Sequence, residues 1–344
     1  MLTAASVGRA RAARTAAALA GILCGCGASG ALASEGGASF YIPGLTLPMA
    51  GFLPPPGVFF DSTTYFYQGK LTGGVNTALG GNIVAGVKAD VKADFLTGLW
   101  VTPLEILGGN LGFSLSLPFG EPAVRAGIVL SGPILNRLVG RPVGISASDS
   151  TFNYGDPVLS TMIGWHAGNW HWKVAAAVNI PAGAYQPGEL SNVALNRWLG
   201  DFSGAITYLD PILGIDLSAA AGLTVNGENP DTDYRTGKEL HFEAGVTKHL
   251  TKELSVGLIG AHYRQITGDS GPGATLGPYK GRATVAGGMV GYDFLLGQTP
   301  ISTKFKLLKE VDVENRPQGT ICWLQVSFPL WIALHAAALP YHGL

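Results

Sequence analysis

The sequence predicts an all-β fold, a transmembrane antiparallel β-barrel of about 12–14 strands, and three observations support this prediction. Apolar and polar residues alternate with a period of two over several segments of about 10 to 13 residues. Such segments match a tilted bilayer-spanning strand of about 9–11 residues better than a sandwich strand of about 5–6. The polar positions hold mostly Gly, Ser, Thr and Asn, as expected for a lumen, rather than the Lys and Glu of a water-facing sheet.

The composition excludes several other classes of protein. Charged residues make up 13% of the chain, about half the usual share, and 50 of the 344 residues are Gly. The formal net charge is −1 and apolar residues make up 47%. A charge-rich disordered chain is therefore excluded, and nothing in the charge balance supplies the basic surface of a nucleic-acid binder. The abundant Gly and Pro exclude a coiled coil.

Residues 1–33 have the composition of a secretory signal peptide. Three arginines precede a short apolar core, and Ala31-Leu32-Ala33 supplies the small residues that favour cleavage before Ser34. Two alternatives remain open, a retained N-terminal anchor and lipoprotein processing at Cys26. Cleavage at Ser34 would leave Cys322 as the one cysteine, so no disulfide framework and no cysteine metal site is expected.

The next segment, residues 34–57, is rich in Pro and Gly. Pro lacks the N–H that a strand ladder needs, so this segment is a poor strand. We expect it to form a plug or extension inside or under the barrel.

Residues 58–330 should form the barrel, and residues 82–95 give its clearest strand. Apolar residues occupy the odd positions there and charged residues the even ones, so one face of the strand is apolar and the other is charged. A charge near the middle of a lipid-facing surface costs about 2–4 kcal/mol, so the charged face of a barrel strand should point inward. The predicted lumen-lining residues are Lys88, Asp90, Lys92, Asp94, Lys173 and Glu243. A lumen wall whose charges alternate in sign suits the passage of uncharged solutes better than that of ions. A water-facing strand of a soluble sheet would show the same sequence pattern.

Similar alternation marks the remaining strands. The candidates are 58–68, 82–95, 111–119, 121–131, 157–167, 170–180, 202–210, 215–225, 238–249, 253–266, 281–293, 300–311 and 319–328. Closure of an antiparallel barrel favours an even number, so one of these thirteen assignments should be wrong. Segments 132–156 and 181–200 have little periodicity and are expected to be extracellular loops or a constriction, and residues 331–344 a C-terminal tail.

Tryptophans lie near several of the expected strand ends, where an interfacial aromatic girdle would place them. They are Trp100, Trp165, Trp170, Trp172 and Trp323. Residues 320–344 are uncharged, but their first half alternates like a strand and they contain Pro329. A last strand that ends near Phe328 is therefore expected rather than a spanning helix.

Several stretches resemble one known family. They are Pro43-Gly44-Leu45, Met49 to Val58, Tyr65 to Gly69, Pro181 to Tyr185 with Asn196-Arg197-Trp198, Asn229 to Gly237, Gln265 to Asp269, and Glu314 to Pro317. Together they resemble the "MetA-pathway of phenol degradation" family over about residues 40–330. The resemblance implies an outer-membrane channel or transporter for hydrophobic or aromatic compounds in a diderm bacterium. One departure is the tail after Phe328, since such barrels often end on an aromatic residue.

No catalytic, cofactor-binding or metal-binding residues are predicted. The Gly-rich runs lack the sequence of a nucleotide-binding loop, and no Gly-x-Ser-x-Gly elbow is present. Passive uptake through the barrel is the main hypothesis, with the lipid bilayer, hydrophobic small molecules and, during biogenesis, the barrel-assembly machinery as partners. The alternatives are a closed structural or binding barrel and an outer-membrane hydrolase. The hydrolase would use His241 or His262 with Ser255 and Asp233 or Asp269.

Overall fold

A computed structural model describes residues 34–76, 82–131, 143–189, 191–275 and 277–333. The expected signal peptide and most of the expected C-terminal tail lie outside these ranges. Among the described residues no helix is long and apolar enough to cross a membrane. The final strand continues to Ile332, beyond the expected end near Phe328, so the first residues of the expected tail belong to the sheet.

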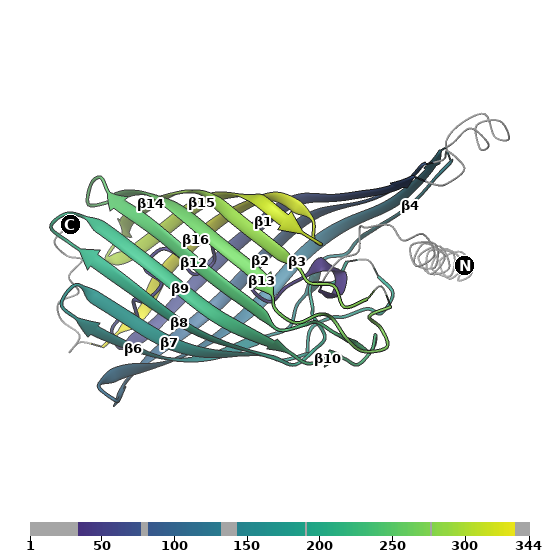
Figure 1. Cartoon of the computed structure of the whole chain (residues 1–344). Coiled ribbons are helices and arrows are strands. Elements are labelled where there is room, and N and C mark those ends of the chain that lie inside the picture. Colours follow the sequence, from purple (N-terminus) through teal and green to yellow (C-terminus); the bar gives the residue numbers. More distant parts are fainter. Residues whose placement is uncertain (1–33, 77–81, 132–142, 190, 276, 334–344) are drawn as a thin grey trace, which may run out of the picture.

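Twelve strands close into one antiparallel barrel (Figure 1). They are β1 (Gly57–Asn76), β2 (Asn82–Ile106), β3 (Gly109–Ser131), β6 (Val158–Ala167), β7 (Trp170–Asn179), β8 (Leu199–Asp210), β9 (Ile215–Asn226), β12 (Glu239–His249), β13 (Leu254–Gln265), β14 (Arg282–Leu296), β15 (Thr299–Glu314) and β16 (Gln318–Ile332). Closure comes from the pairing of β16 with β1. The surplus expected strand arises because segments 111–119 and 121–131 form the single strand β3.

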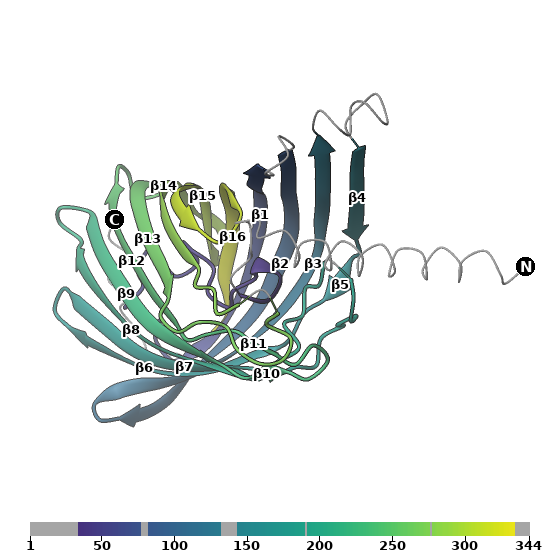
Figure 2. The same cartoon turned by 45° about the vertical axis from the view of Figure 1, so that its right-hand side comes forward.

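The first three strands extend beyond the closed wall and carry β4 (Val143–Ser150) and β5 (Asn153–Tyr154) (Figure 2). Strand β3 pairs with β6 only as far as Ser116, and from Ala123 onward it pairs with β4 instead. The expected loop at 132–156 therefore contains strand structure, which its weak periodicity did not reveal. We call this projecting sheet the arm.

The connections divide the barrel into two ends. At one end the turns are short, such as Leu107-Gly108 between β2 and β3, where both residues have positive φ. This backbone matches the two-residue turn that suits twisted hairpins. The other end carries the long connections, including 180–198 and the small β10–β11 pair (Glu228–Asn229, Tyr234–Arg235). We call these the short-turn end and the long-loop end.

Alternation places opposite chemistry on the two faces of the wall. On β7, Trp170 and Trp172 are exposed on the outside, whereas His171 between them is buried. On β9 the outward residues are Leu217 and Val225, and Asp216 is buried inside. The exposed outer surface is thus apolar, as a lipid-facing band requires. Trp323 departs from the expected girdle, because it points inward and is fully buried.

Residues 34–56 run lengthwise through the barrel, and we call them the lumen segment (Figure 1, purple). The segment starts with the one-turn 3₁₀ helix η1 (Glu35–Gly37) near the long-loop end. It reaches the short-turn end at Pro56, whose carbonyl accepts a hydrogen bond from Ala333 N.

Candidate functional site: the barrel lumen

The lumen segment is held by polar side chains from one side of the wall. Asp216 on β9 accepts a hydrogen bond from Met49 N at 3.0 Å, and Thr207 on β8 accepts one from Gly51 N at 2.9 Å. Both side chains are buried. Backbone groups that no strand pairs with therefore find partners on the inner face of the barrel, as buried N–H groups require.

Gly44 is fixed from two directions. Its N–H donates to Glu243 Oε1 on β12 at 3.0 Å, and its carbonyl accepts from Lys306 Nζ on β15 at 2.8 Å. Trp323 Nε1 on β16 donates to the neighbouring Pro43 carbonyl at 3.0 Å. Gly44 has φ +82, which favours Gly, and a Cβ there would require the buried Leu308 side chain to shift.

A second group of contacts anchors the lumen segment at the long-loop end. Glu35 forms an ion pair with Arg197 at 3.3 Å and accepts hydrogen bonds from Asn229 Nδ2 and Thr232 Oγ1. Arg197 is 1% exposed, so this pair is shielded from solvent and connects η1 to the 180–198 and β10–β11 connections. The long loops and the lumen segment therefore form one packed unit.

Between the lumen segment and the opposite wall lies a cavity of about 1890 Å³. Several aromatic residues border it, and we call four of them the aromatic strip: Tyr41, Tyr65, Tyr67 and Phe95. The Tyr65 and Tyr67 rings stack with centroids 6.3 Å apart, and Tyr65 also packs on Trp323 at 4.6 Å. Burial raises the pKa of the Tyr41 phenol above its ordinary value, so the ring stays neutral.

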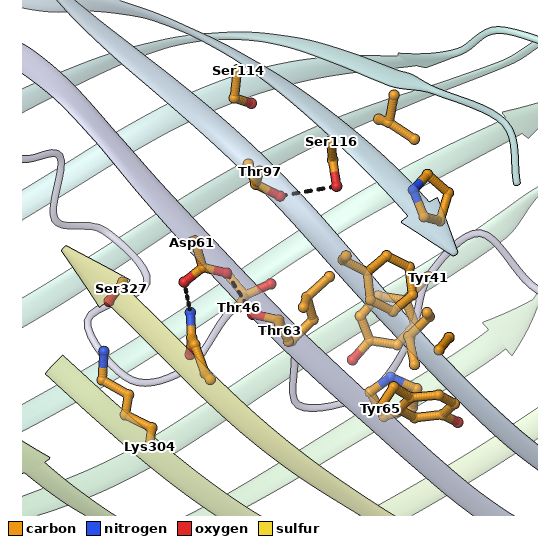
Figure 3. Close-up of a pocket in the computed structure, with 18 of the residues that line it drawn as sticks. Tyr41, Thr46, Asp61, Thr63, Tyr65, Thr97, Ser114, Ser116, Lys304 and Ser327 are labelled. Atoms are coloured by element: carbon orange, nitrogen blue, oxygen red, sulfur yellow. Dashed lines mark hydrogen bonds between the residues drawn. The ribbon is translucent and has the colours of Figure 1, made fainter. Parts of the chain in front are cut away.

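Hydroxyl groups and a few charges line the cavity beside the aromatic strip (Figure 3). Thr97 Oγ1 donates to Ser116 Oγ at 2.9 Å, and Asp61 accepts from Gln325 Nε2 at 2.7 Å. Lys304 also lines this region. The cavity thus offers flat aromatic surfaces next to groups that can form hydrogen bonds.

Of the predicted lumen-lining residues, Lys92, Lys173 and Glu243 border the cavity. The other members of the β2 row, Lys88, Asp90 and Asp94, do not border it. Ala93 lies opposite Tyr65, whose side chain faces the lumen, so the alternate row on β2 points outward. Lys88 and Asp90 are exposed beside a shallow surface depression, although Lys92 also borders the main cavity.

The physical reason for this correction is the arm. Lys88 pairs with Arg125 and Asp90 with Ala123, on the part of β3 that has left the closed wall. Asp94, nearest to the closed wall, accepts hydrogen bonds from Ser62 and Thr64 on β1. Charges on the arm avoid the cost of facing lipid without turning inward, so the energetic argument for a lumen position does not apply to them.

The hydrolase candidates are not assembled into a site. His241 Nε2 lies 2.9 Å from Asp201 Oδ2, and its ring stacks on Tyr41 at 4.3 Å. His262 instead contacts Thr284, and Asp269 accepts hydrogen bonds from the Gly237 amide and the Gln265 amide group. No group of three or more His, Cys, Asp or Glu residues suited to a metal ion occurs among the described residues.

Sequence reasoning missed several residues that hold the lumen segment, including Asp216, Glu239 and Lys306. All three are buried on the inner row of the alternation, but only Asp216 is a lone charge, since β12 and β15 hold other charged residues beside Glu239 and Lys306. For Asp216 that isolation was an available signal. An isolated charge on a bilayer-spanning strand must face inward and needs a buried partner.

Comparison with known families decides the relationship. Residues 72–326 match the family described as MetA-pathway of phenol degradation. The chain belongs to this family. No curated protein matches the chain.

Solved structures show which fold this family member shares. The COG4313 outer membrane channel from Pseudomonas putida F1 is 16% identical, with a TM-score of 0.62, over 82% of this chain and 99% of that one. The CymD monoaromatic hydrocarbon channel is 7% identical, with a TM-score of 0.41, over 82% of this chain and 90% of that one. The fold of this family member is therefore that of an outer-membrane β-barrel.

Proposed function

We propose that this protein is a passive outer-membrane channel for the uptake of hydrophobic or aromatic small molecules. The observation that carries the proposal is the cavity of about 1890 Å³ beside the lumen segment, lined by the aromatic strip. Aromatic pairs gain about 0.5–1.5 kcal/mol beyond the burial of their area, so the strip would hold a planar apolar solute weakly and reversibly. Weak binding at successive surfaces permits both entry and exit.

Orientation follows from the lengths of the connections. Barrels of the outer membrane have short periplasmic turns and long extracellular loops, so the long-loop end and the arm would face the outside. A solute would enter between the loops, pass along the aromatic strip, and leave near the short-turn end beside Lys304 and Ser327. No residue performs covalent chemistry in this mechanism, and the concentration gradient drives transport.

The proposal also concerns the partners of the chain. The outward apolar rows would contact the outer-membrane bilayer, and the barrel-assembly machinery would insert the barrel after export and signal cleavage. Membrane fractionation followed by a gel with and without heating tests the membrane location. A folded barrel should sediment with the outer membrane and migrate differently before and after boiling.

The decisive experiment measures both the single-channel conductance of the purified protein and the uptake of aromatic compounds by cells. Purified protein in a planar bilayer should give repeated single-channel openings, and a strain lacking the gene should take up phenol or toluene more slowly at low external concentration. Expression of this gene in the deletion strain should restore the uptake. Absence of openings together with unchanged uptake in the deletion strain would overturn the proposal.

A closed structural or binding barrel is the second candidate, favoured by the hydrogen bonds that hold the lumen segment to the wall at Gly44, Met49 and Gly51. Such a barrel would bind aromatic compounds without passing them. Quenching of tryptophan fluorescence by toluene, without any conductance, would identify this case. The same experiments thus separate the two candidates.

A further inference from the structure

The first described residue, Ser34, occupies a buried site at the long-loop end of the barrel. Its backbone nitrogen lies 3.1 Å from Asp269 Oδ2, and the residue is 2% exposed. Its Oγ lies 3.4 Å from Glu239 Oε1 and 3.2 Å from the Tyr263 hydroxyl. Two carboxylates and a phenol therefore surround the start of the lumen segment.

Among the described residues neither carboxylate forms an ion pair with a Lys, Arg or His side chain, although Arg197 and Arg316 attract Glu239 electrostatically. Asp269 is 4% exposed and accepts hydrogen bonds from the Gly237 amide, Gln265 Nε2, Tyr234 OH and Ser34 N. Glu239 is fully buried and accepts from Ser39, Tyr263 and Ser34. Buried carboxylates normally have a cationic partner, because desolvation of an unpaired charge is costly. Asp269 therefore has no cation in direct contact with it among the described side chains, and the arginines act only on Glu239, without forming an ion pair.

The backbone of Ser34 gives independent evidence. Its φ is +63 and its ψ is 146, a combination that is essentially limited to Gly and costs about 1–3 kcal/mol for other residues. The angle φ is defined by the carbonyl carbon of the preceding residue, and the strain arises from clashes with that carbonyl group. If Ser34 were the first residue of the chain, this strain would disappear.

We propose that cleavage between Ala33 and Ser34 creates an α-ammonium group that binds Asp269 and Glu239 at the long-loop end and completes the docking of the lumen segment. In the cleavage step, water adds to the Ala33 carbonyl under the action of a signal peptidase. The carbonyl carbon becomes a carboxylate and the Ser34 nitrogen leaves as an amine, which takes up the released proton. The ammonium then has three donors in place of one N–H, and charge-assisted hydrogen bonds replace a neutral one.

The order of events follows from the position of the site. Signal peptides are removed on the periplasmic side of the inner membrane, whereas Ser34 lies at the end of the barrel opposite Pro56, where β1 begins. Processing must therefore precede docking. The new N-terminus has to pass through the lumen toward the long loops while the barrel closes around it, and its charge supplies a direct ionic partner for Asp269.

Two measurements on the purified, detergent-folded protein test the proposal. Intact-mass analysis should give a chain that starts at Ser34. An amine-reactive ester at neutral pH should label the α-amino group roughly tenfold or more slowly in the folded protein than in the boiled protein, because an ammonium held by carboxylates is a poor nucleophile. Exposed lysines such as Lys88 and Lys309 provide an internal standard, since they should react in both samples. A different first residue, or equally fast labelling of the folded protein, would overturn the proposal.

Variants distinguish binding of the α-ammonium group by Asp269 from a protection that any folded barrel would give. Asp269→Asn should speed labelling of the α-amino group in the folded protein while heat-modifiable migration is kept. Asp233→Asn, which removes an exposed charge in the neighbouring connection, should leave labelling as slow as in the wild type. Insertion of one Ala between Ala33 and Ser34 should restore fast labelling even if Asp269→Asn does not fold. Protection that survives both Asp269→Asn and the insertion would contradict the proposal, and neither result depends on whether the barrel conducts.

Discussion

Two parts of the barrel wall differ in what they present to the lumen. The anchoring wall, formed by β8, β9, β12, β15 and β16, presents isolated buried polar groups that bind residues 43–51. The open wall, formed by β1, β2 and β3, presents mainly aromatic, small or hydroxyl side chains, including Phe95, Ala93 and Ser116. The lumen segment is bound by the first wall, whereas the cavity is bordered by both walls, for example by Glu243 of the first and Ser116 of the second.

This difference shows how one barrel can hold a segment and still leave space for a solute. Asp216, Glu243 and Lys306 each have a buried polar atom that forms its hydrogen bond with the lumen segment. Buried polar groups without partners cost about 1–3 kcal/mol each, so the segment should stay docked. The open wall has no such requirement, since its hydroxyls can bond to each other, as Thr97 and Ser116 do.

The largest effect should follow from removing a charge of the anchoring wall. Glu243→Ala removes the acceptor of the Gly44 N–H and leaves the fully buried Lys306 side chain with only the weaker attraction of Asp61, so the free energy of unfolding should fall by about 3–5 kcal/mol. Urea unfolding in detergent measures this change. The double variant Glu243→Leu with Lys306→Met should recover much of the loss, because a well-packed apolar pair avoids the buried charge. Equal stability of Glu243→Ala and the wild type would contradict the assignment of an anchoring wall.

A smaller effect is expected at Gly44, compared with a matched glycine. Gly44 has φ +82 and Gly188 has φ +84, so substitution by Ala costs each about 1–2 kcal/mol of backbone strain. Only at Gly44 would the new methyl group meet Leu308, whereas nothing lies near it at Gly188. We expect Gly44→Ala to lower the free energy of unfolding by about 1–3 kcal/mol more than Gly188→Ala. If the two variants lost the same stability, the close fit of the lumen segment would be wrong.

On the open wall, function should change more than stability. Ala93→Trp places a large ring in the cavity opposite Tyr65, and single-channel conductance and toluene uptake should fall severalfold. Leu115→Trp on the outer face of β3 is the control, since this residue is 41% exposed on the lipid-facing side. Its conductance should match that of the wild type. Undiminished uptake by Ala93→Trp would place the solute path elsewhere.

The smallest effect distinguishes two lysines. Lys173 borders the cavity, so Lys173→Gln should shift the reversal potential in a salt gradient toward cation selectivity. Lys88 is exposed on the outside of the arm, and Lys88→Gln should leave selectivity unchanged and stability within about 0.5 kcal/mol of the wild type. A selectivity shift from Lys88→Gln would show that the β2 row does line the pathway.

Sequence alternation predicted the all-β barrel because it reports a local property. Leu217 and Asp216 lie on opposite faces of β9 whatever surrounds them, since successive side chains of a strand point in opposite directions. The same rule separated Lys88 and Asp90 from Val87 and Val91 but could not say which face is the interior. Which face of β2 is the interior depends on how β3 pairs with β2 on one side and with β6 on the other, and therefore on pairing between strands that are distant in the sequence.

By itself, then, the sequence determined the strand class, the strand count to within one, the apolar outer surface and three residues that border the cavity, Lys92, Lys173 and Glu243. The tertiary structure alone decided the arm, the two walls and the contacts of Gly44 and Ser34, which join residues about 200 positions apart in the chain. Periodicity is encoded in neighbouring residues, whereas the partner of a buried charge is chosen by closure of the barrel. That closure brings Glu243 and Lys306 to opposite sides of the same glycine.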